Sequence, residues 1–458
     1  MFKNFLPLFL SFFIIGNVHT KKIIIPFKTT HNIAINYMQS LLYNQIYATL
    51  EIGTNKQVAY IAISTAETYF AMESANINKF SYNYNKSDSY KKNGGMFIDN
   101  EREQRYMVGD ILNDTFHFYD SLDAKKENIK AYNDLMFAYI SKLGRYCYPE
   151  DNGYIDNNQT LISGTIGLQI TVYYNDYDQI NILKSLKNLN LIDKLAWNIN
   201  YTNSEEGYLI IGEFPHQYNG SYSEDNRKST ACTTPSDRDF SWTFSFTDIK
   251  SGDNKLNSYR YADYSPQYGL IIGTSEYLTL IKPYFDSLKK CELKELTHKQ
   301  TKYSYYECSI DVNISNFKNL TFIHNELGQK FILDKDDLFK DYNGKKYFLV
   351  LFQAKGETQK WALGTPFVKK YPLTFDHESR NIFYYESGNN NEEEGTPTSK
   401  IILICVCVFL GIGAVILGII LGKVFVAKRK KKKAKELVEE INNNDETEYN
   451  EDYNKLGV

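Results

Sequence analysis

Two stretches of the chain place a glutamate beside a short run of small and hydroxyl residues. The first is Ser64-Thr65-Ala66-Glu67, which follows the β-rich run Val58–Ile63, and the second is Gly273-Thr274-Ser275-Glu276. Two carboxylates held about 3 Å apart cannot both ionise, so they share one proton and can activate a water molecule for hydrolysis. Glu67 and Glu276 are candidates for such a pair. The alternative is that they are two solvated loop glutamates.

The same stretches resemble the catalytic loops of pepsin-like aspartic proteases. In that family a strand with the pattern I-G-T-P-x-Q leads into a second strand that ends at D-T-G-S, and here Ser64 stands at the aspartate position. Gly269–Ser275 resembles the second loop of the family, with Ile271 at the second aspartate position. A serine hydroxyl is too weakly acidic to replace a carboxylate base, and isoleucine does not titrate. The resemblance therefore predicts a retained fold without its dyad, unless Glu67 and Glu276 supply a displaced one.

Further motifs extend the resemblance from about Ala48 to Tyr385, in the order that the family shows. The resemblance implies a mainly β, bilobal fold with an N-terminal lobe at 21–225 and a C-terminal lobe at 226–387. The matching segments are Ser163–Leu168, Gly207–Glu213, Trp242–Ile249, Gly273–Leu288, Trp361–Phe367 and Leu373–Asp376.

A third catalytic feature of the family, the flap hairpin over the cleft, is also altered. The corresponding stretch is Met96–Arg102, where Ile98 stands at the position of the flap tyrosine. Ala66 replaces the glycine of the first loop, and a glycine there would let the turn bend. What remains is a cleft that could hold an extended peptide by strand-like hydrogen bonds. The alternative is a vestigial cleft in a stable scaffold.

The pattern of the chain between these motifs favours short strands separated by turn residues. Strands are predicted at Tyr47–Ile52, Val58–Ile63, Gly207–Gly212, Trp242–Phe246 and Lys346–Phe352. Helices are predicted at Ile180–Leu189 and Glu276–Lys290.

The two ends of the chain predict a single-pass type I membrane protein. Residues 1–20 have the basic start and short apolar run of a signal peptide. A polar stalk at 388–400 precedes an apolar span at 401–426, which is long enough for about 30 Å of hydrocarbon. The basic run that follows places the tail, 427–458, in the cytosol. Gly418 and Gly422 fit a helix dimer face, and the expected location is the plasma membrane or the endolysosomal membrane.

Four cysteines and seven glycosylation sequons fall on the predicted luminal side. An even number of cysteines in an oxidising compartment indicates two disulfides. The family resemblance pairs Cys291 with Cys308, which leaves Cys147 with Cys232. The sequons begin at Asn85, Asn113, Asn158, Asn200, Asn219, Asn313 and Asn319.

Composition excludes several classes of partner. The formal net charge is −3, and no basic run lies outside the juxtamembrane segment, so no nucleic acid is expected. No metal-ligand motif is present, and no metal or cofactor is predicted. The leading hypothesis is an inactive protease-like protein for recognition or scaffolding. The alternatives are an active membrane-anchored endopeptidase and a sorting receptor, which would use Tyr453–Leu456 as an adaptor signal.

Overall fold

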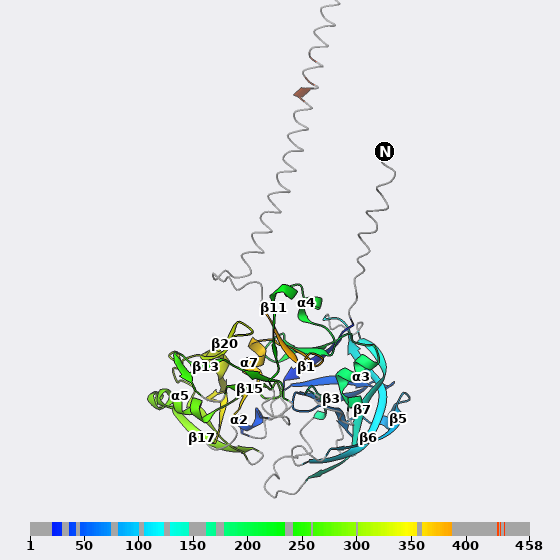
Figure 1. The fold of residues 1–458 in the computed structure, drawn as a ribbon, viewed down its shortest axis with the longest axis horizontal. Coiled ribbons are helices and arrows are strands. Elements are labelled where there is room, and N and C mark those ends of the chain that lie inside the picture. Colours follow the sequence, from blue (N-terminus) through cyan, green and yellow to red (C-terminus); the bar gives the residue numbers. More distant parts are fainter. Residues whose placement is uncertain are drawn as a thin grey trace, which may run out of the picture. The chain divides into compact units, whose positions relative to one another are not determined.

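The computed structural model (Figure 1) places most of the segment between Lys21 and Glu386. Residues up to Gly388 form one compact unit, and Asn389–Val458 form a second. The expected signal peptide, stalk and membrane span lie outside the described residues. None of the helices in the described part of the chain is long and apolar enough to cross a membrane. The described residues are 21–29, 36–42, 46–74, 81–99, 105–122, 129–145, 162–170, 178–233, 241–257, 260–298, 301–354, 360–386, 428, 429, 431 and 435.

The largest sheet joins both ends of the compact unit. The strand Thr374–Asp376 pairs with Ala196–Tyr201, which is joined through Glu206–Ile211 to Ile23–Thr29, so the predicted lobe boundary at 225/226 is not a boundary between sheets. In spatial order the strands are β11 (Arg227–Ala231), β26 (Asn381–Tyr385), β25 (Thr374–Asp376), β9 (Ala196–Tyr201), β10 (Glu206–Ile211), β1 (Ile23–Thr29), β2 (Ile46–Ile52), β3 (Gln57–Ser64), β8 (Ile162–Gly167), β4 (Phe70–Glu73), β7 (Ile129–Arg145), β6 (Arg105–Tyr119) and β5 (Lys91–Asp99).

Two further sheets are built from the second half of the unit. One has the order β12 (Thr243–Ser245), β15 (Tyr261–Tyr264), β24 (Trp361–Leu363), β16 (Ile271–Gly273), β23 (Val350–Gln353), β18 (Thr301–Ser309), β22 (Lys345–Phe348) and β21 (Phe339–Tyr342), with β17 (Cys291–His298) beside β18. The other has the order β14 (Asn254–Leu256), β13 (Asp248–Ser251), β19 (Leu320–His324) and β20 (Gln329–Leu333). The fold is mainly β and pepsin-like, as the sequence predicted.

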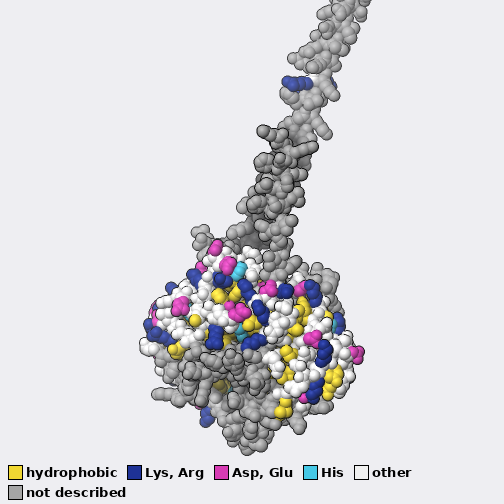
Figure 2. Space-filling model, turned by 45° about the vertical axis from the view of Figure 1, so that its right-hand side comes forward, with side chains coloured by type: hydrophobic (Ala, Val, Ile, Leu, Met, Phe, Trp, Pro, Cys, Tyr) yellow, Lys and Arg dark blue, Asp and Glu magenta, His cyan; other side chains and the backbone are white. Residues whose placement is uncertain are grey.

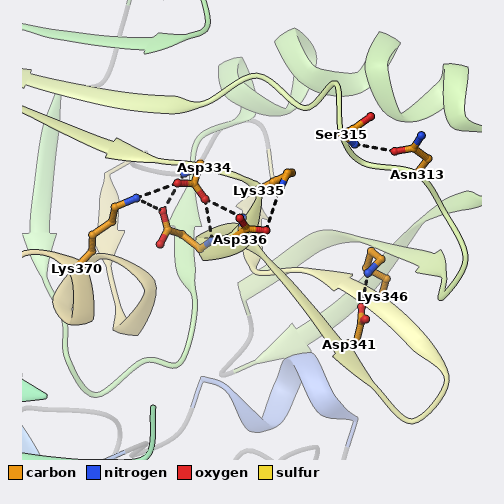
Figure 3. A network of polar contacts seen from close by, with 9 residues as sticks. Asn313, Ser315, Asp334, Lys335, Asp336, Asp341, Lys346 and Lys370 are labelled. Atoms are coloured by element: carbon orange, nitrogen blue, oxygen red, sulfur yellow. Dashed lines mark hydrogen bonds and ion pairs between the residues drawn. The ribbon is translucent and has the colours of Figure 1, made fainter. Parts of the chain in front are cut away.

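The helices are short, and their ends follow local capping chemistry. The Thr274 hydroxyl accepts the N–H of Tyr277 and so starts the longest helix one residue before the predicted position. Lys370 contacts both Asp334 and Asp337 at the capping box of α6 (Figure 3). The helices are α2 (Tyr37–Ser40), α3 (Ile182–Asn188), α4 (Pro215–Tyr218), α5 (Ser275–Leu288), α6 (Lys335–Leu338) and α7 (Thr365–Lys370).

The single strand predicted at Lys346–Phe352 is two strands, β22 and β23. The chain changes partners at Leu349, whose N–H bonds to the carbonyl of Leu338 while its own carbonyl accepts the N–H of Ile271. After this point β23 runs parallel to β16. Because the run Tyr347–Phe352 continues through this point without a turn residue, the sequence carries no sign of the change.

The unit contains an internal structural repeat. β3 pairs in parallel with β8, and β15 pairs in parallel with β24. After β3 the chain turns back, and the next strand, β4, pairs antiparallel with the other edge of β8. After β15 the chain turns back in the same way, and β16 pairs antiparallel with the other edge of β24. Ala71 opposes Thr165 in the first repeat, and Ile272 opposes Ala362 in the second.

Two glycines mark equivalent points of the repeats, because each packs directly against a loop carbonyl. A Cβ atom on Gly167 would lie 2.6 Å from the carbonyl oxygens of Glu67 and Tyr69. A Cβ atom on Gly364 would lie 2.5 Å from the carbonyl oxygen of Tyr268 and 2.0 Å from that of Leu270. These close approaches fix both loops by backbone contact, whatever side chains the loops carry.

Replacing Gly364 with alanine is therefore expected to be strongly destabilising. The new Cβ atom would overlap backbone rather than a mobile side chain, so the free energy of unfolding should fall by about 3 kcal/mol. Gly220→Ala is the matched control, because no atom lies within 4 Å of the Cβ position there. Thermal or denaturant unfolding measures both variants, and equal stabilities would contradict this packing.

Candidate functional site

The first loop of the candidate site begins where β3 ends. Ser64 and Thr65 are both buried, each about 4% exposed. The Ser64 hydroxyl accepts the N–H of Ala66 at 3.1 Å, and the Ser64 carbonyl accepts the N–H of Leu168 at 2.8 Å. The loop is thus held to β8 through its backbone, and the hydroxyl of Ser64 has a local partner.

The counterpart of Ser64 in the second repeat is Ser265. Ser64 opposes Gly167 at the end of the β3–β8 pairing, while the β15–β24 pairing ends with Tyr264 opposite Leu363. The next residues along are Ser265 and Gly364, and the Ser265 N–H bonds to the Leu363 carbonyl at 3.0 Å. The two glycine contacts give the same alignment, since Glu67 lies three residues after Ser64 and Tyr268 three after Ser265.

The prediction of Ile271 for this position is therefore corrected. Ile271 is the first residue of β16, pairs with Val350, and is fully buried. By the register of the repeats its counterpart is Phe70, the first residue of β4, rather than Ser64. The Gly273-Thr274-Ser275 run that suggested a catalytic loop is instead the end of β16 and the cap of α5.

Hydrogen bonds of Thr65 join the two loops directly. The Thr65 hydroxyl donates to the Tyr264 carbonyl at 2.8 Å, and the carboxamide Oε1 of Gln267 lies 3.0 Å from the same hydroxyl. Ser64 directly precedes Thr65, and Ser265 directly follows Tyr264, so the two serines flank this junction. The residue equivalent to Thr65 is Pro266, which has neither a hydroxyl nor an N–H to return the contact.

The fallback glutamates do not occupy equivalent places. Glu67 lies in the first loop, where its carbonyl accepts the N–H of Gln169. Glu276 lies in the first turn of α5, beyond β16, and its carboxylate accepts the backbone N–H of Asn257 at 2.7 Å. The counterpart of Glu67 in the second loop is Tyr268. A symmetric Glu67/Glu276 dyad does not follow from this arrangement.

A nearby aspartate in β15 is bound to other groups. The carboxylate of Asp263, two residues before Ser265, lies 2.5 Å from the Thr243 hydroxyl and 2.7 Å from the Lys360 ammonium. Both of these partners lie outside the two loops.

The expected flap is present as a β-hairpin. β5 pairs antiparallel with β6, and the backbone of Ile98 opposes that of Val108. The side chain of Ile98 and the hairpin tip, 100–104, lie outside the described residues. The base of the hairpin is held by Asp114, a buried carboxylate that accepts the Thr115 N–H at 2.7 Å and the Ser87 hydroxyl at 3.1 Å. It also accepts the hydroxyls of Tyr82 and Ser89.

The loop after β8 connects the site to an aromatic core whose members, Trp197, Trp242 and His377, lie far apart in the sequence. The Leu168 carbonyl accepts the indole N–H of Trp242 at 2.7 Å and is also hydrogen-bonded by His377. Trp197 donates its indole N–H to Nε2 of His377 at 3.2 Å. Both tryptophans contact the partly buried imidazole, and desolvation lowers the pKa of His377 to about 3, against the raising effect of the Leu168 hydrogen bond and with a smaller lowering from Lys184.

One predicted disulfide is confirmed. Cys291 and Cys308 are bonded and stand opposite each other at the start of β17 and the end of β18. Cys232 contacts Ser241 and Thr243, but Cys147 lies outside the described residues, so the second pairing stays a prediction.

The predicted glycosylation sites differ in accessibility. Asn85, Asn313 and Asn319 are exposed, whereas Asn113, Asn200 and Asn219 are partly buried and Asn158 lies outside the described residues. Asn313 forms a turn with Ser315 of its own sequon, as Figure 3 shows. The Asn113 side chain donates to the Asp134 carbonyl at 3.3 Å from within β6.

No group of three or more His, Cys, Asp or Glu side chains within the described ranges could hold a metal ion. A family model described as eukaryotic aspartyl protease matches residues 45–384. The match covers both loops, the β5–β6 hairpin and all but the last residue of β26. A comparison with curated proteins gives no match.

His377 is expected to make the protein less stable in acid. Its pKa is lower in the folded state than the value of 6.5 expected when it is unfolded, so the folded state binds fewer protons between pH 6.5 and about 3. As the pH falls from 6.5 to about 3, the free energy of unfolding should decrease by up to about 1.4 kcal/mol per pH unit.

His377→Gln keeps a donor and an acceptor but removes the titration, so it should flatten this part of the pH–stability curve. His216→Gln is the control, since burial lowers the pKa of His216 less. Denaturant unfolding between pH 3 and 7 measures both variants. An unchanged slope in His377→Gln would disprove the role of the imidazole.

Proposed function

The chain belongs to the eukaryotic aspartyl protease family, and we propose that it is a non-hydrolytic member that recognises peptide or protein ligands. The observation that carries this proposal is the pair Ser64 and Ser265 at equivalent positions of the two repeats. The family resemblance assigns the position of Ser64 to a catalytic carboxylate, and the register of the repeats makes Ser265 its counterpart.

Serine hydroxyls at both positions would leave peptide hydrolysis without its base. In the carboxylate mechanism one group is ionised and withdraws a proton from water, while the other is protonated and polarises the scissile carbonyl. A serine hydroxyl stays neutral across the physiological pH range, so neither role can be filled. The Ser64 hydroxyl accepts the N–H of Ala66, whereas a nucleophilic serine is activated by donating its proton to an adjacent general base.

The features that position a ligand are retained more fully than those that cut it. The flap hairpin β5–β6 is formed, and Asp114 anchors its base. The two loops are joined by Thr65 and Tyr264. A cleft between such elements holds an extended segment by backbone hydrogen bonds, which need no titratable group.

We further propose display on the luminal side of a membrane of the secretory pathway. The support is the order of a signal peptide, an ectodomain with a disulfide, an apolar span and a basic run in the sequence. Basic and acidic side chains are interspersed on the face shown in Figure 2, which suits a soluble ectodomain.

The alternative function is membrane-anchored endopeptidase activity through displaced carboxylates. Its one supporting observation is Glu67, which shares the first loop with Ser64. It also needs a partner carboxylate near Ser265, and the second loop offers Tyr268 at the matching position.

The proposal predicts no cleavage of an unstructured protein substrate by the purified full chain between pH 3 and 7. Ser64→Ala/Ser265→Ala and Glu67→Gln/Glu276→Gln should then match the wild-type blank. An aspartic protease inhibitor is the control for contaminating enzymes. Inhibitor-sensitive cleavage that disappears in Glu67→Gln/Glu276→Gln would establish the endopeptidase alternative and refute the proposal.

Luminal display predicts selective glycosylation. Chain made in a eukaryotic secretory system should carry N-glycans at Asn313 and Asn319, because both side chains are exposed. Asn113 should remain bare, because its amide is engaged with Asp134 inside a sheet. Glycopeptide mass spectrometry reads each site. Bare sites throughout would argue against luminal display.

A further inference from the structure

The second repeat has an apolar face that a distant segment of the same chain covers. The side chains of this face come from β16, β23, β24 and the residue before β16; they include Leu270, Ile272, Leu351 and Ala362. In the first repeat the matching positions, among them Ala71 and Ala138, pack with Ile111 of the hairpin strand β6. The two faces are structurally equivalent, but different segments of the chain pack against them.

The segment Asn36–Leu42, which contains α2, packs against the apolar face of the second repeat. Asn36 caps the helix by accepting the N–H groups of Met38 at 3.0 Å and Gln39 at 3.3 Å. The segment buries four apolar side chains in the cluster with the face, and they are Tyr37, Met38, Leu41 and Leu42. Their spacing places them on one side of a single helical turn and its continuation.

Specific polar and aromatic contacts accompany this apolar burial. The Leu41 carbonyl accepts the N–H of Gly269 at 2.8 Å, and the Asn36 carboxamide donates to the Tyr305 hydroxyl at 3.1 Å. The Tyr37 ring stacks on that of Tyr342 with centroids 4.2 Å apart. Gly269 belongs to the second loop, four residues after Ser265, so the segment reaches the candidate site itself.

We propose that this face is a ligand site of the cleft and that Asn36–Leu42 fills it as an internal ligand. This inference rests on the proposed function, because it assumes that the cleft binds peptides. An external ligand would bind by displacing the segment. The contacts define the external ligand as a short peptide turn that begins with an amide cap followed by an aromatic residue. Apolar residues stand one, four and five positions after the aromatic residue, and one carbonyl is directed at the Gly269 amide.

Because the segment is part of the same chain, it should outcompete free peptides for the apolar face. The segment lies between β1 and β2, which pair with each other in the large sheet and so tether it to the fold at both ends. A short tether gives an effective concentration on the order of 1 mM. A free peptide with the same contacts would need a comparable concentration, or additional contacts with the flap side, to replace it.

The test uses Tyr37→Ala/Leu41→Ala in the full chain, with hydrogen exchange at the Gly269 amide as the measurement. Loss of the stack and of apolar burial should release the segment, so the Gly269 amide should exchange at least about tenfold faster than in wild type. An acetylated and amidated peptide of Asn36–Leu42, at about 1 mM, should slow this exchange again in the variant and leave wild type unchanged.

Tyr90→Ala/Leu293→Ala is the control, because both side chains are exposed and lie outside the cluster. Unchanged exchange at Gly269 in a folded Tyr37→Ala/Leu41→Ala variant would overturn the internal-ligand assignment. Faster exchange that the peptide does not reverse would overturn the ligand site. Both results are independent of the cleavage assay, so they are distinguishable from a failure of the proposed function.

Discussion

The contact between the Thr65 hydroxyl and the Tyr264 carbonyl is the point on which the arrangement of the site depends. It joins the ends of β3 and β15, the strands that carry the two loops. On either side, Gly167 and Gly364 approach loop carbonyls so closely that no side chain fits. The glycine contacts act through the backbone, and the contact between the two loops acts through Thr65. The residues at 64 and 265 can therefore change without loss of the fold, which is how a protease-like architecture can persist around two serines.

Replacing carboxylates with serines also changes the energetics of the site. Two neighbouring carboxylates repel unless they share a proton, and burial raises the cost of their charge. Ser64 and Ser265 carry no charge, so the junction avoids this repulsion. The second loop has Pro266 and Gln267 after Ser265, and the Gln267 carboxamide lies beside the Thr65 hydroxyl. The junction is thus held by neutral hydrogen bonds.

The sequence predicted the fold and the first loop well, because their signals are local. The strand predicted at Val58–Ile63 differs from β3 by one residue at each end, and the helix predicted at Glu276–Lys290 differs from α5 by one or two residues at each end. The second loop was misplaced because Ser265-Pro266-Gln267-Tyr268 contains neither the threonine nor the glycine of the motif. Only the pairing of β15 with β24 reveals its position. The packing of Tyr37 against Tyr342 is similarly invisible, since the contact joins residues far apart in sequence.

The most direct test of the central claim is a carboxylate titration by NMR of the variant Ser64→Asp/Ser265→Asp. If these positions face each other as the dyad positions do, the pair should share a proton and titrate in two steps, with one apparent pKa well above the usual value of about 3.9. The variant Ser64→Asp/Ile271→Asp should show no such coupling. Independent titration in the first variant, or coupling in the second, would contradict the assignment of Ser265 and the account built on it.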